Sequence, residues 1–193
     1  MRALGSLRQT LLEEYEALPP VRKLGYRLYR NPLVMFGLGP VFVFFLQQRL
    51  PIGLMTQGWR PWRSTLGNLA GIAVGLALLI WWVGAAPVLV INFLTMIVAA
   101  TIGVWLFYVQ HQFEGVAWAR NDDWNRDDAA LRGSSYYDLP PVLRWLTANI
   151  GIHHVHHLSS RIPFYRLSDI LNDHPELKSV NRLGLWESFR TVR

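Results

Sequence analysis

Fifty consecutive residues, 64–113, contain no Asp, Glu, Lys or Arg. Soluble helical domains rarely show such a run, because helices at a water-exposed surface keep a charged stripe. The run divides at Gly84-Ala85-Ala86-Pro87 into two mainly apolar segments, 66–83 and 88–109. Each segment has about the 20 residues that a helix needs to cross the hydrocarbon core. The pattern predicts a transmembrane helical hairpin over residues 66–110, and the alternative is a buried helical pair of a soluble bundle.

A third apolar run, residues 33–46, has the sequence LVMFGLGPVFVFFL. It has only 14 residues, two of them Gly and one Pro, and this is short for a membrane span. If it crossed the membrane, the basic segments 22–30 and 49–63 would lie on opposite sides, against the positive-inside rule. We therefore expect an interfacial or re-entrant element, with both basic segments in the cytoplasm.

The net charge of +6 comes entirely from the N-terminal part of the chain. Residues 1–63 hold nine Lys or Arg against three Glu, whereas residues 114–193 hold ten of each sign. We expect residues 1–32 to form a cytoplasmic basic segment, residues 47–65 a cytoplasmic loop and residues 111–193 a cytoplasmic helical cap. The expected fold is an all-α, multi-pass integral membrane protein.

The composition also limits the chemistry of the chain. It has no Cys, so a disulfide framework and thiolate metal ligands are excluded. Residues 1–20 show no features of a secretory signal peptide, and no period-2 pattern indicates a β-strand. The basic surplus suits anionic lipid headgroups or an acidic electron carrier, and nucleic acid is not an expected partner.

Histidine is confined to the C-terminal part of the chain, with none in residues 1–110 and four in the sequence HHVHH. Short His-rich tracts are typical of metal binding. On a helix His153, His156 and His157 would share one face, because residues three and four positions apart are neighbours. His111 lies at the end of the second apolar segment and is a fourth candidate ligand.

The neighbouring side chains have less specific interpretations. Packing, or support of a ligand, explains His154 at least as well as ligation does, and a surface turn explains His174. Glu114, Asp138 and Asn149 are candidates for orienting the ligand imidazoles. Imidazole ligands without thiolate suit Zn, Cu or Fe, and the residues alone do not choose among them. Zinc at this position would favour hydrolysis of headgroups, and iron would favour oxidation of acyl chains.

Two segments around these histidines resemble the membrane-bound fatty acid desaturases. Residues Tyr108–Glu114 read YVQHQFE, and residues Asn149–Leu167 read NIGIHHVHHLSSRIPFYRL. In that family iron is held by three histidine boxes, HxxxH, HxxHH and HxxHH, and by an isolated His after the last span. The resemblance identifies four iron ligands, the third box and the isolated histidine: His153, His156, His157 and His111.

The similarity extends over LEEYEALPPVRKLGYRLYRNPLVMFGLGP and over ALRGSSYYDLPPVLRW. The first two boxes, with five His between them, have no counterpart, because residues 1–110 contain no His. The resemblance therefore implies an N-terminally truncated desaturase that starts just past the second box. Phe164, at a position where the family has Asn, is a minor departure.

The resemblance implies that the complete enzyme uses a di-iron centre and O2 to introduce a cis double bond into an acyl lipid or acyl thioester. Its electrons would come from a carrier such as ferredoxin or cytochrome b5. No catalytic residue apart from the metal ligands is expected, and the fragment alone should be inactive because its ligand set is incomplete. Two alternatives stay open, a related di-iron membrane hydroxylase and a non-enzymatic membrane protein that binds metal or haem.

Overall fold

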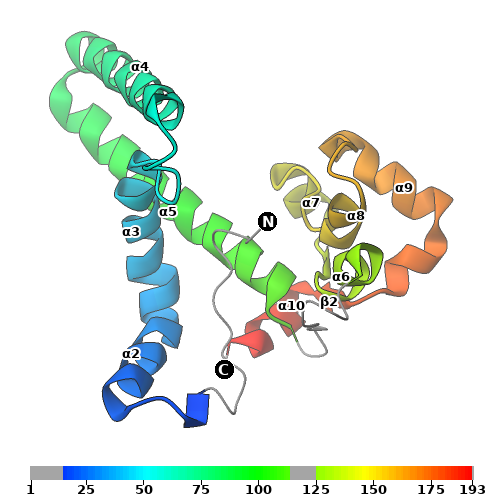
Figure 1. Cartoon of the computed structure of the whole chain (residues 1–193). Helices are drawn as coiled ribbons and strands as arrows, with labels where there is room; N and C mark the ends of the chain where they lie inside the picture. Colours follow the sequence, from blue (N-terminus) through cyan, green and yellow to red (C-terminus); the bar gives the residue numbers. More distant parts are fainter. Residues whose placement is uncertain (1–14, 114–124, 193) are drawn as a thin grey trace. The chain divides into compact units, whose positions relative to one another are not determined.

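The computed structural model describes residues 15–113 and 125–192, which are predominantly helical (Figure 1). The chain divides into two units, residues 1–104 and 105–193, which we call the N-terminal unit and the C-terminal unit. Long apolar helices dominate the first, and short helices with one small sheet build the second. The expected all-α membrane protein is confirmed, because two helices are long and apolar enough to cross a membrane.

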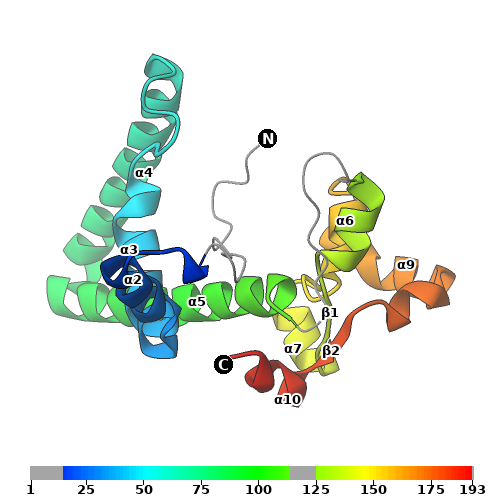
Figure 2. The same cartoon turned by 60° about the horizontal axis from the view of Figure 1, so that its bottom comes forward.

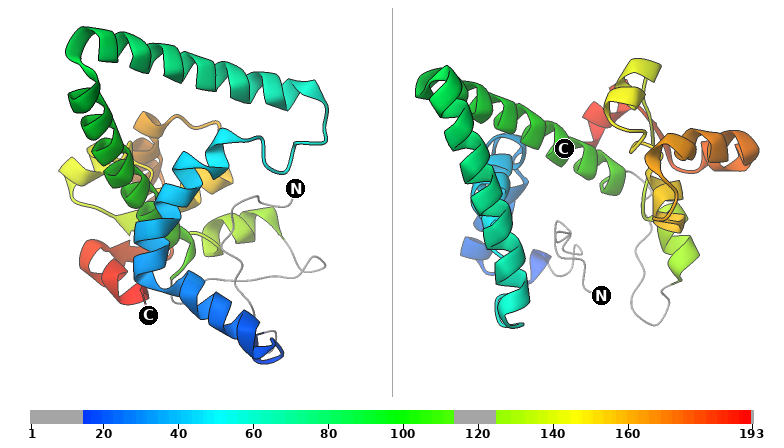
Figure 3. Two further views of the ribbon diagram at one scale, coloured as in Figure 1. Left: turned by 90° about the vertical axis from the view of Figure 1, so that its left-hand side faces the viewer. Right: turned by 90° about the horizontal axis from the view of Figure 1, so that it is seen from above.

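These two helices are α4, Trp59–Val83, and α5, Ala85–His111. They contain the predicted segments and extend beyond them, so that only Gly84 separates them. Gly84 has a φ of 99°, which residues with a side chain rarely adopt. Pro87 lies in the first turn of α5, where its missing N–H costs no hydrogen bond, so the turn is shorter than the predicted Gly-Ala-Ala-Pro. Figure 3 shows the two helices diverging from this corner.

The third apolar run is broken from the helix that precedes it. The chain forms α2 (Pro20–Arg30), the π-helical turn η1 (Val34–Leu38), α3 (Gly39–Phe45) and the 3-10 turn η2 (Gln47–Arg49). The helix axis bends by 63° between α2 and the segment that follows. The break falls at Asn31-Pro32, because a residue before Pro is disfavoured in the helical region, and Asn31 has a ψ of 129°.

The segment η1–α3 runs antiparallel beside α5. The Thr101 hydroxyl donates a hydrogen bond of 3.1 Å to the Phe36 carbonyl, and the ring centroids of Phe45 and Phe93 are 5.6 Å apart. The hydrogen bond from Thr101 joins η1 to α5 and fixes the level of η1 along that helix.

The C-terminal unit is built from short elements around a two-stranded sheet. In chain order they are α6 (Arg126–Arg132), β1 (Tyr136–Asp138), α7 (Pro141–Leu146), α8 (His153–Leu158), η4 (Phe164–Arg166), α9 (Leu167–Asp173), η5 (Pro175–Ser179), β2 (Arg182–Gly184), α10 (Leu185–Ser188) and η6 (Phe189–Thr191). β1 and β2 pair in parallel, with Tyr136 opposite Arg182 (Figure 2). The sequence did not predict this pair, because strands of three residues are too short to show a period-2 pattern.

One carboxylate ties the sheet to the helix that follows it. Asp138 on β1 accepts from Arg144 of α7 at 2.8 Å and from Arg182 of β2 at 2.6 Å, and the Tyr136 hydroxyl donates to it at 3.0 Å. A small apolar core lies beside this network and contains Tyr136, Ile152, Val155, Leu167 and Leu171. Ile152 and Val155 place the start of α8 in this core, so α8 is anchored to the sheet.

Candidate metal centre

The loop before α8 holds the first histidine against the sheet. The Tyr137 N–H donates to the Gly151 carbonyl at 2.8 Å, and a Cβ on Gly151 would clash with the Tyr137 carbonyl oxygen. Ile152 then forms an antiparallel bridge with Tyr136, and α8 begins at His153. The close backbone approach at Gly151 therefore sets the position of the helix that carries the histidine cluster.

Asn149 secures the same loop from its other side. Ala148 and Asn149 have φ values of 52° and 55°, in the left-handed region that side chains disfavour. The Asn149 side chain donates to the Phe164 carbonyl at 3.1 Å and accepts from the Ser168 hydroxyl at 3.3 Å. Asn is the residue with a side chain that most readily tolerates this conformation, and its amide here compensates part of the backbone strain.

The last turn of α5, which belongs to the C-terminal unit, is joined to the rest of that unit by hydrogen bonds to its terminal carbonyls. The Ser135 N–H donates to the Gln110 carbonyl at 3.0 Å, and the Ser135 hydroxyl donates to the Val109 carbonyl at 3.1 Å. The Gln110 side chain donates to the Ile150 carbonyl at 3.0 Å, in the loop that leads to α8. These contacts satisfy the orphan carbonyls of a helix end and hold His111 at a fixed place relative to α8.

Three imidazoles converge between these two elements. The Nε2 atoms of His111 and His153 are 3.0 Å apart, and those of His153 and His157 are also 3.0 Å apart. One ligand nitrogen from each of the three residues lies within 4.8 Å of the other two. Nitrogens bound about 2.1 Å from one metal ion at right angles to each other are separated by about 3 Å. The two 3.0 Å separations fit pairs of ligands of one ion, and His111 and His157, which lie within 4.8 Å of each other, need to be no more than about 4.2 Å apart to share it.

The hydrogen bonds of the cluster agree with metal ligation. The His111 Nδ1 lies 3.3 Å from the Gly133 carbonyl oxygen, which only accepts, so Nδ1 carries the proton and Nε2 presents its lone pair. An N–H donated to a backbone carbonyl is the usual support of a metal-bound His. The Nδ1 of His153 is buried and has no hydrogen-bond partner among the described residues. Its Nε2 meets two other nitrogens, and one shared proton cannot serve both, whereas a cation would.

Two histidines of the group, His153 and His157, have a pKa well below the ordinary value of an imidazole. Burial, together with the neighbouring imidazoles, lowers the pKa of His153 to about 2. Burial, together with the neighbouring imidazoles of His111 and His156, lowers the pKa of His157 to about 4. A neutral imidazole has the free lone pair that metal binding requires. The cluster is therefore in the protonation state of a ligand set.

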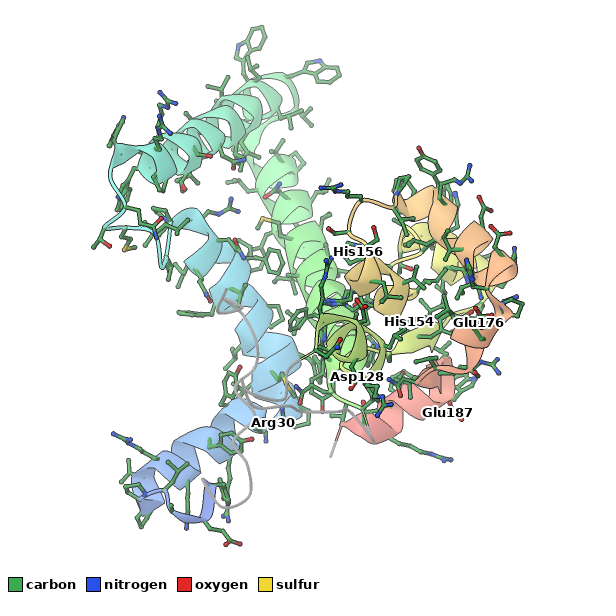
Figure 4. The ribbon with its side chains drawn as sticks, turned by 45° about the vertical axis from the view of Figure 1, so that its right-hand side comes forward. Arg30, Asp128, His154, His156, Glu176 and Glu187 are labelled. Carbon is green, nitrogen blue, oxygen red and sulfur yellow. The ribbon has the colours of Figure 1, made fainter. Side chains whose placement is uncertain are left out.

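His156 is not part of the group of three. Its ring centroid lies 5.6 Å from that of His153 and 6.0 Å from that of His157, and its side chain is half-buried. His154 points to a different side of α8 from His156 (Figure 4). Its side chain is fully buried and donates from Nε2 to the Leu177 carbonyl at 3.0 Å. His174 is exposed and lies 3.2 Å from the Glu176 carboxylate.

The residues expected to orient the ligands have other partners. Asp138 is bound to Arg144 and Arg182, and Asn149 to Phe164 and Ser168. Glu114 lies outside the described residues. The groups that do support the cluster are the Gly133 carbonyl, Gln110 and Ser135. Sequence reasoning missed the Gly133 carbonyl because the Gly-Ser-Ser sequence indicates only a turn, and a backbone acceptor has no side-chain signature.

Comparisons with known proteins give the family of this chain. The model of the family described as "Fatty acid desaturase" matches residues 10–186. A fatty acid desaturase of Bacillus subtilis is 39% identical over 99% of this chain and 54% of its own length. A chloroplastic omega-6 fatty acid desaturase of Arabidopsis thaliana is 25% identical over 80% of this chain and 34% of its own.

The chain thus spans about half, or less, of the length of these relatives. No solved structure matches it. The family match covers most of the chain and includes the segment from His111 to His157, where the three imidazoles converge. The chain belongs to the fatty acid desaturase family.

Proposed function

We propose that this chain supplies part of the iron site of a membrane-bound acyl desaturase, an oxidoreductase that uses O2. The iron ligands in this chain are His111, His153, His156 and His157. The observation that carries the proposal is the convergence of three imidazole Nε2 atoms within a chain of this family. His156 neighbours the group of three and is placed to bind a second ion, because its ring lies next to both other ligands of α8.

When bound, a di-iron centre supplies the activation of O2 that removes two hydrogens from an acyl chain and leaves a cis double bond. The chain's own residues hold and orient the ligands. The Gly133 carbonyl fixes the tautomer of His111, and the buried start of α8 fixes His153. The substrate is an acyl lipid or an acyl thioester, and a carrier such as ferredoxin or cytochrome b5 delivers the electrons.

The proposed membrane arrangement follows from the two span-length helices. α4 and α5 cross the bilayer, and residues 33–46 form an interfacial or re-entrant element. The basic segments 1–32 and 47–65 and the metal-binding part, residues 111–193, lie in the cytoplasm. Iron held just beyond the end of a span would be reached by an acyl chain from the membrane side.

The number of imidazoles limits what this chain can do alone. The proposed set has four His, and His154 is engaged with the Leu177 carbonyl. Two irons need more ligands than this, and an ion with open positions is weakly held. The chain expressed alone should therefore bind at most one iron and form no double bonds, and the remaining ligands would come from the part of the enzyme that the relatives have and this chain lacks.

The test is a chimera in which this chain replaces the matching 54% of the Bacillus subtilis relative. The chimera and the chain alone are expressed in a host with a suitable electron donor, and total fatty acids are profiled by gas chromatography. New unsaturated species are expected from the chimera only. In the chimera His156→Ala and His157→Ala should abolish them, whereas His174→Ala, which removes an exposed His, should not.

Four other outcomes would contradict the proposal. Unsaturated products from the chain alone would refute the argument from ligand number, and hydroxylated products from the chimera would assign it to the hydroxylase branch. A Soret band in the purified chain would favour a haem protein. Full activity of the His157→Ala chimera would remove this cluster from the iron site.

A further inference from the structure

Helix α2 has two chemically distinct faces. At 100° per residue Val21, Leu24 and Leu28 lie within one third of the helix circumference. The opposite side carries four cations, which are Arg22, Lys23, Arg27 and Arg30. Such separation is typical of helices that lie in a membrane surface, where the apolar face enters the acyl chains and the cations reach the headgroups.

The apolar face of α2 is open. The side chains of Val21, Leu24 and Leu28 are 81%, 58% and 55% exposed. The polar side has contacts instead, because Arg27 donates to the Tyr15 hydroxyl at 2.8 Å and the Lys23 ammonium lies 5.8 Å from the centre of the Tyr15 ring. These contacts hold the cationic side and leave the three aliphatic side chains facing outward.

The packing of η1 beside α5 gives the depth at which α2 lies. Thr101, which binds the Phe36 carbonyl, is ten residues from the end of α5, or about 15 Å along the helix. Going back from Phe36 toward Asn31 moves the chain about 7 Å toward that same end. If α5 spans the bilayer, the corner at Asn31 therefore lies near its boundary, and the 63° bend turns α2 away from the direction of η1–α3.

The charge of the surrounding sequence selects an anionic surface. Residues 17–113 contain seven Lys or Arg and no Asp or Glu. A basic segment at the membrane boundary is attracted to anionic lipids, and each cation adds to the attraction. An acidic protein would satisfy the cations alone, but it would leave the aliphatic face of α2 in water. A lipid surface satisfies both the cationic and the apolar side of α2, and the chain continues from α2 directly into the apolar residues 33–46.

We propose that α2 lies in the plane of the membrane surface, with Val21, Leu24 and Leu28 among the acyl chains and its four cations on the phosphates of anionic phospholipids. The inference rests on α5 crossing the membrane and not on desaturase chemistry. α2 would thereby act as an in-plane anchor that fixes the level of the bent segment after it.

The absence of Cys makes a direct test available, because any single Cys introduced is the only site of labelling. The full chain is reconstituted into vesicles of phosphatidylcholine with and without phosphatidylglycerol. A nitroxide is attached at Leu24→Cys, Leu28→Cys or Arg22→Cys, and its accessibility to oxygen and to a water-soluble nickel chelate is measured. The oxygen-to-nickel ratio should be severalfold higher at the first two positions than at Arg22→Cys, and should rise with phosphatidylglycerol.

Two matched variants separate charge from insertion. Arg22→Gln/Lys23→Gln/Arg27→Gln in the Leu28→Cys background should lose the dependence on phosphatidylglycerol. Arg49→Gln/Arg60→Gln/Arg63→Gln, which removes the same charge outside α2, should retain it. A label at Val98→Cys reports in the same vesicles that α5 is inserted.

Equal exposure to the nickel chelate at Leu24→Cys, Leu28→Cys and Arg22→Cys, with Val98→Cys buried in lipid, would overturn the proposal while leaving the desaturase assignment intact. Protection of Leu24→Cys only after addition of an acidic carrier protein would also overturn it, and would make α2 a protein-docking surface. A Val98→Cys label in water would instead contradict the membrane arrangement on which both proposals depend.

Discussion

The two units use their side chains in opposite ways. In the N-terminal unit α4 and most of α5 direct apolar side chains outward, and their backbone groups are satisfied within each helix. In the C-terminal unit residues far apart in the sequence meet, as Asp138 meets Arg182 and Tyr137 meets Gly151. A span needs hydrophobicity more than it needs particular contacts, whereas a ligand set must be held to about 0.5 Å. Substitutions should therefore be tolerated better in the spans of the N-terminal unit than at the contacts of the C-terminal unit.

The largest difference is expected between two glycines. Gly151→Ala places a Cβ against the Tyr137 carbonyl oxygen, which is backbone and cannot move aside. We expect a loss of about 3 kcal/mol in the free energy of opening of the C-terminal unit, as for other overpacked sites. Hydrogen exchange measured by mass spectrometry on peptides that cover 136–184 reports it directly.

The matched change is Gly71→Ala in α4, where a Cβ would meet nothing within 4 Å. Protection of both units should be unchanged or slightly increased, because Ala favours a helix over Gly. Equal losses from the two substitutions would show that the contrast between the units is false.

A smaller effect is expected at Asp138. Burial alone would raise the pKa of its carboxyl, but hydrogen bonds from Arg182 and Tyr136 and the charges of Arg182 and Arg144 outweigh burial and lower that pKa. Asp138→Asn should cost about 2 kcal/mol at pH 7, the range for a hydrogen-bonded charge that keeps some exposure. The same exchange measurement, repeated over pH, tests it.

The sign of the pH dependence follows from the lowered pKa. The carboxylate contributes stability above its unfolded pKa of about 3.8, and this contribution is lost as the pH falls through the folded value. The difference between the parent and Asp138→Asn should therefore be constant from pH 5 upward and should shrink in acid. A difference that grows as the pH falls would contradict the assigned ion pairs.

The smallest effect is expected in the N-terminal unit, at the hydrogen bond that the Thr101 hydroxyl of α5 donates to η1. Thr101→Val keeps the shape of the side chain and removes the donor to the Phe36 carbonyl. Polar contacts between membrane helices average about 0.6 kcal/mol, so we expect a loss of that size. The control is Thr95→Val, at an exposed position of α5, which should change nothing. Protection of peptides over 34–45 is the readout, and a loss above about 2 kcal/mol would place this contact among the strong ones of the C-terminal unit.

Sequence reasoning succeeded where one physical property is repeated along the chain. The uncharged run predicted α4 and α5, because hydrophobicity over twenty residues does not depend on tertiary contacts. It misjudged the turn between them, since Pro87 is compatible with the start of a helix and a single Gly84 is enough. It did not predict the bend after Arg30.

The site was accessible to sequence reasoning only in part. The spacing of His153 and His157 put both on one face of α8, and the position of His111 at a helix end made it a candidate. Spacing alone could not separate His156, which shares that face but stays outside the group of three. The supports of the cluster are a carbonyl and a close backbone approach at Gly151, and these depend on contacts that no local pattern encodes.

The parallel pairing of β1 with β2 has a consequence for biosynthesis. α8 lies inside a loop whose two ends, at Tyr136 and Arg182, are joined by that sheet. A chain made at about 5–20 residues per second completes α8 a few seconds before Arg182 is available. During that interval the histidines of α8 exist as a nascent peptide without the strand that closes their loop. At the proposed iron site, loading is therefore expected only after Arg182 has paired with Tyr136, and a delivery system that acted earlier on the growing chain would find no finished site.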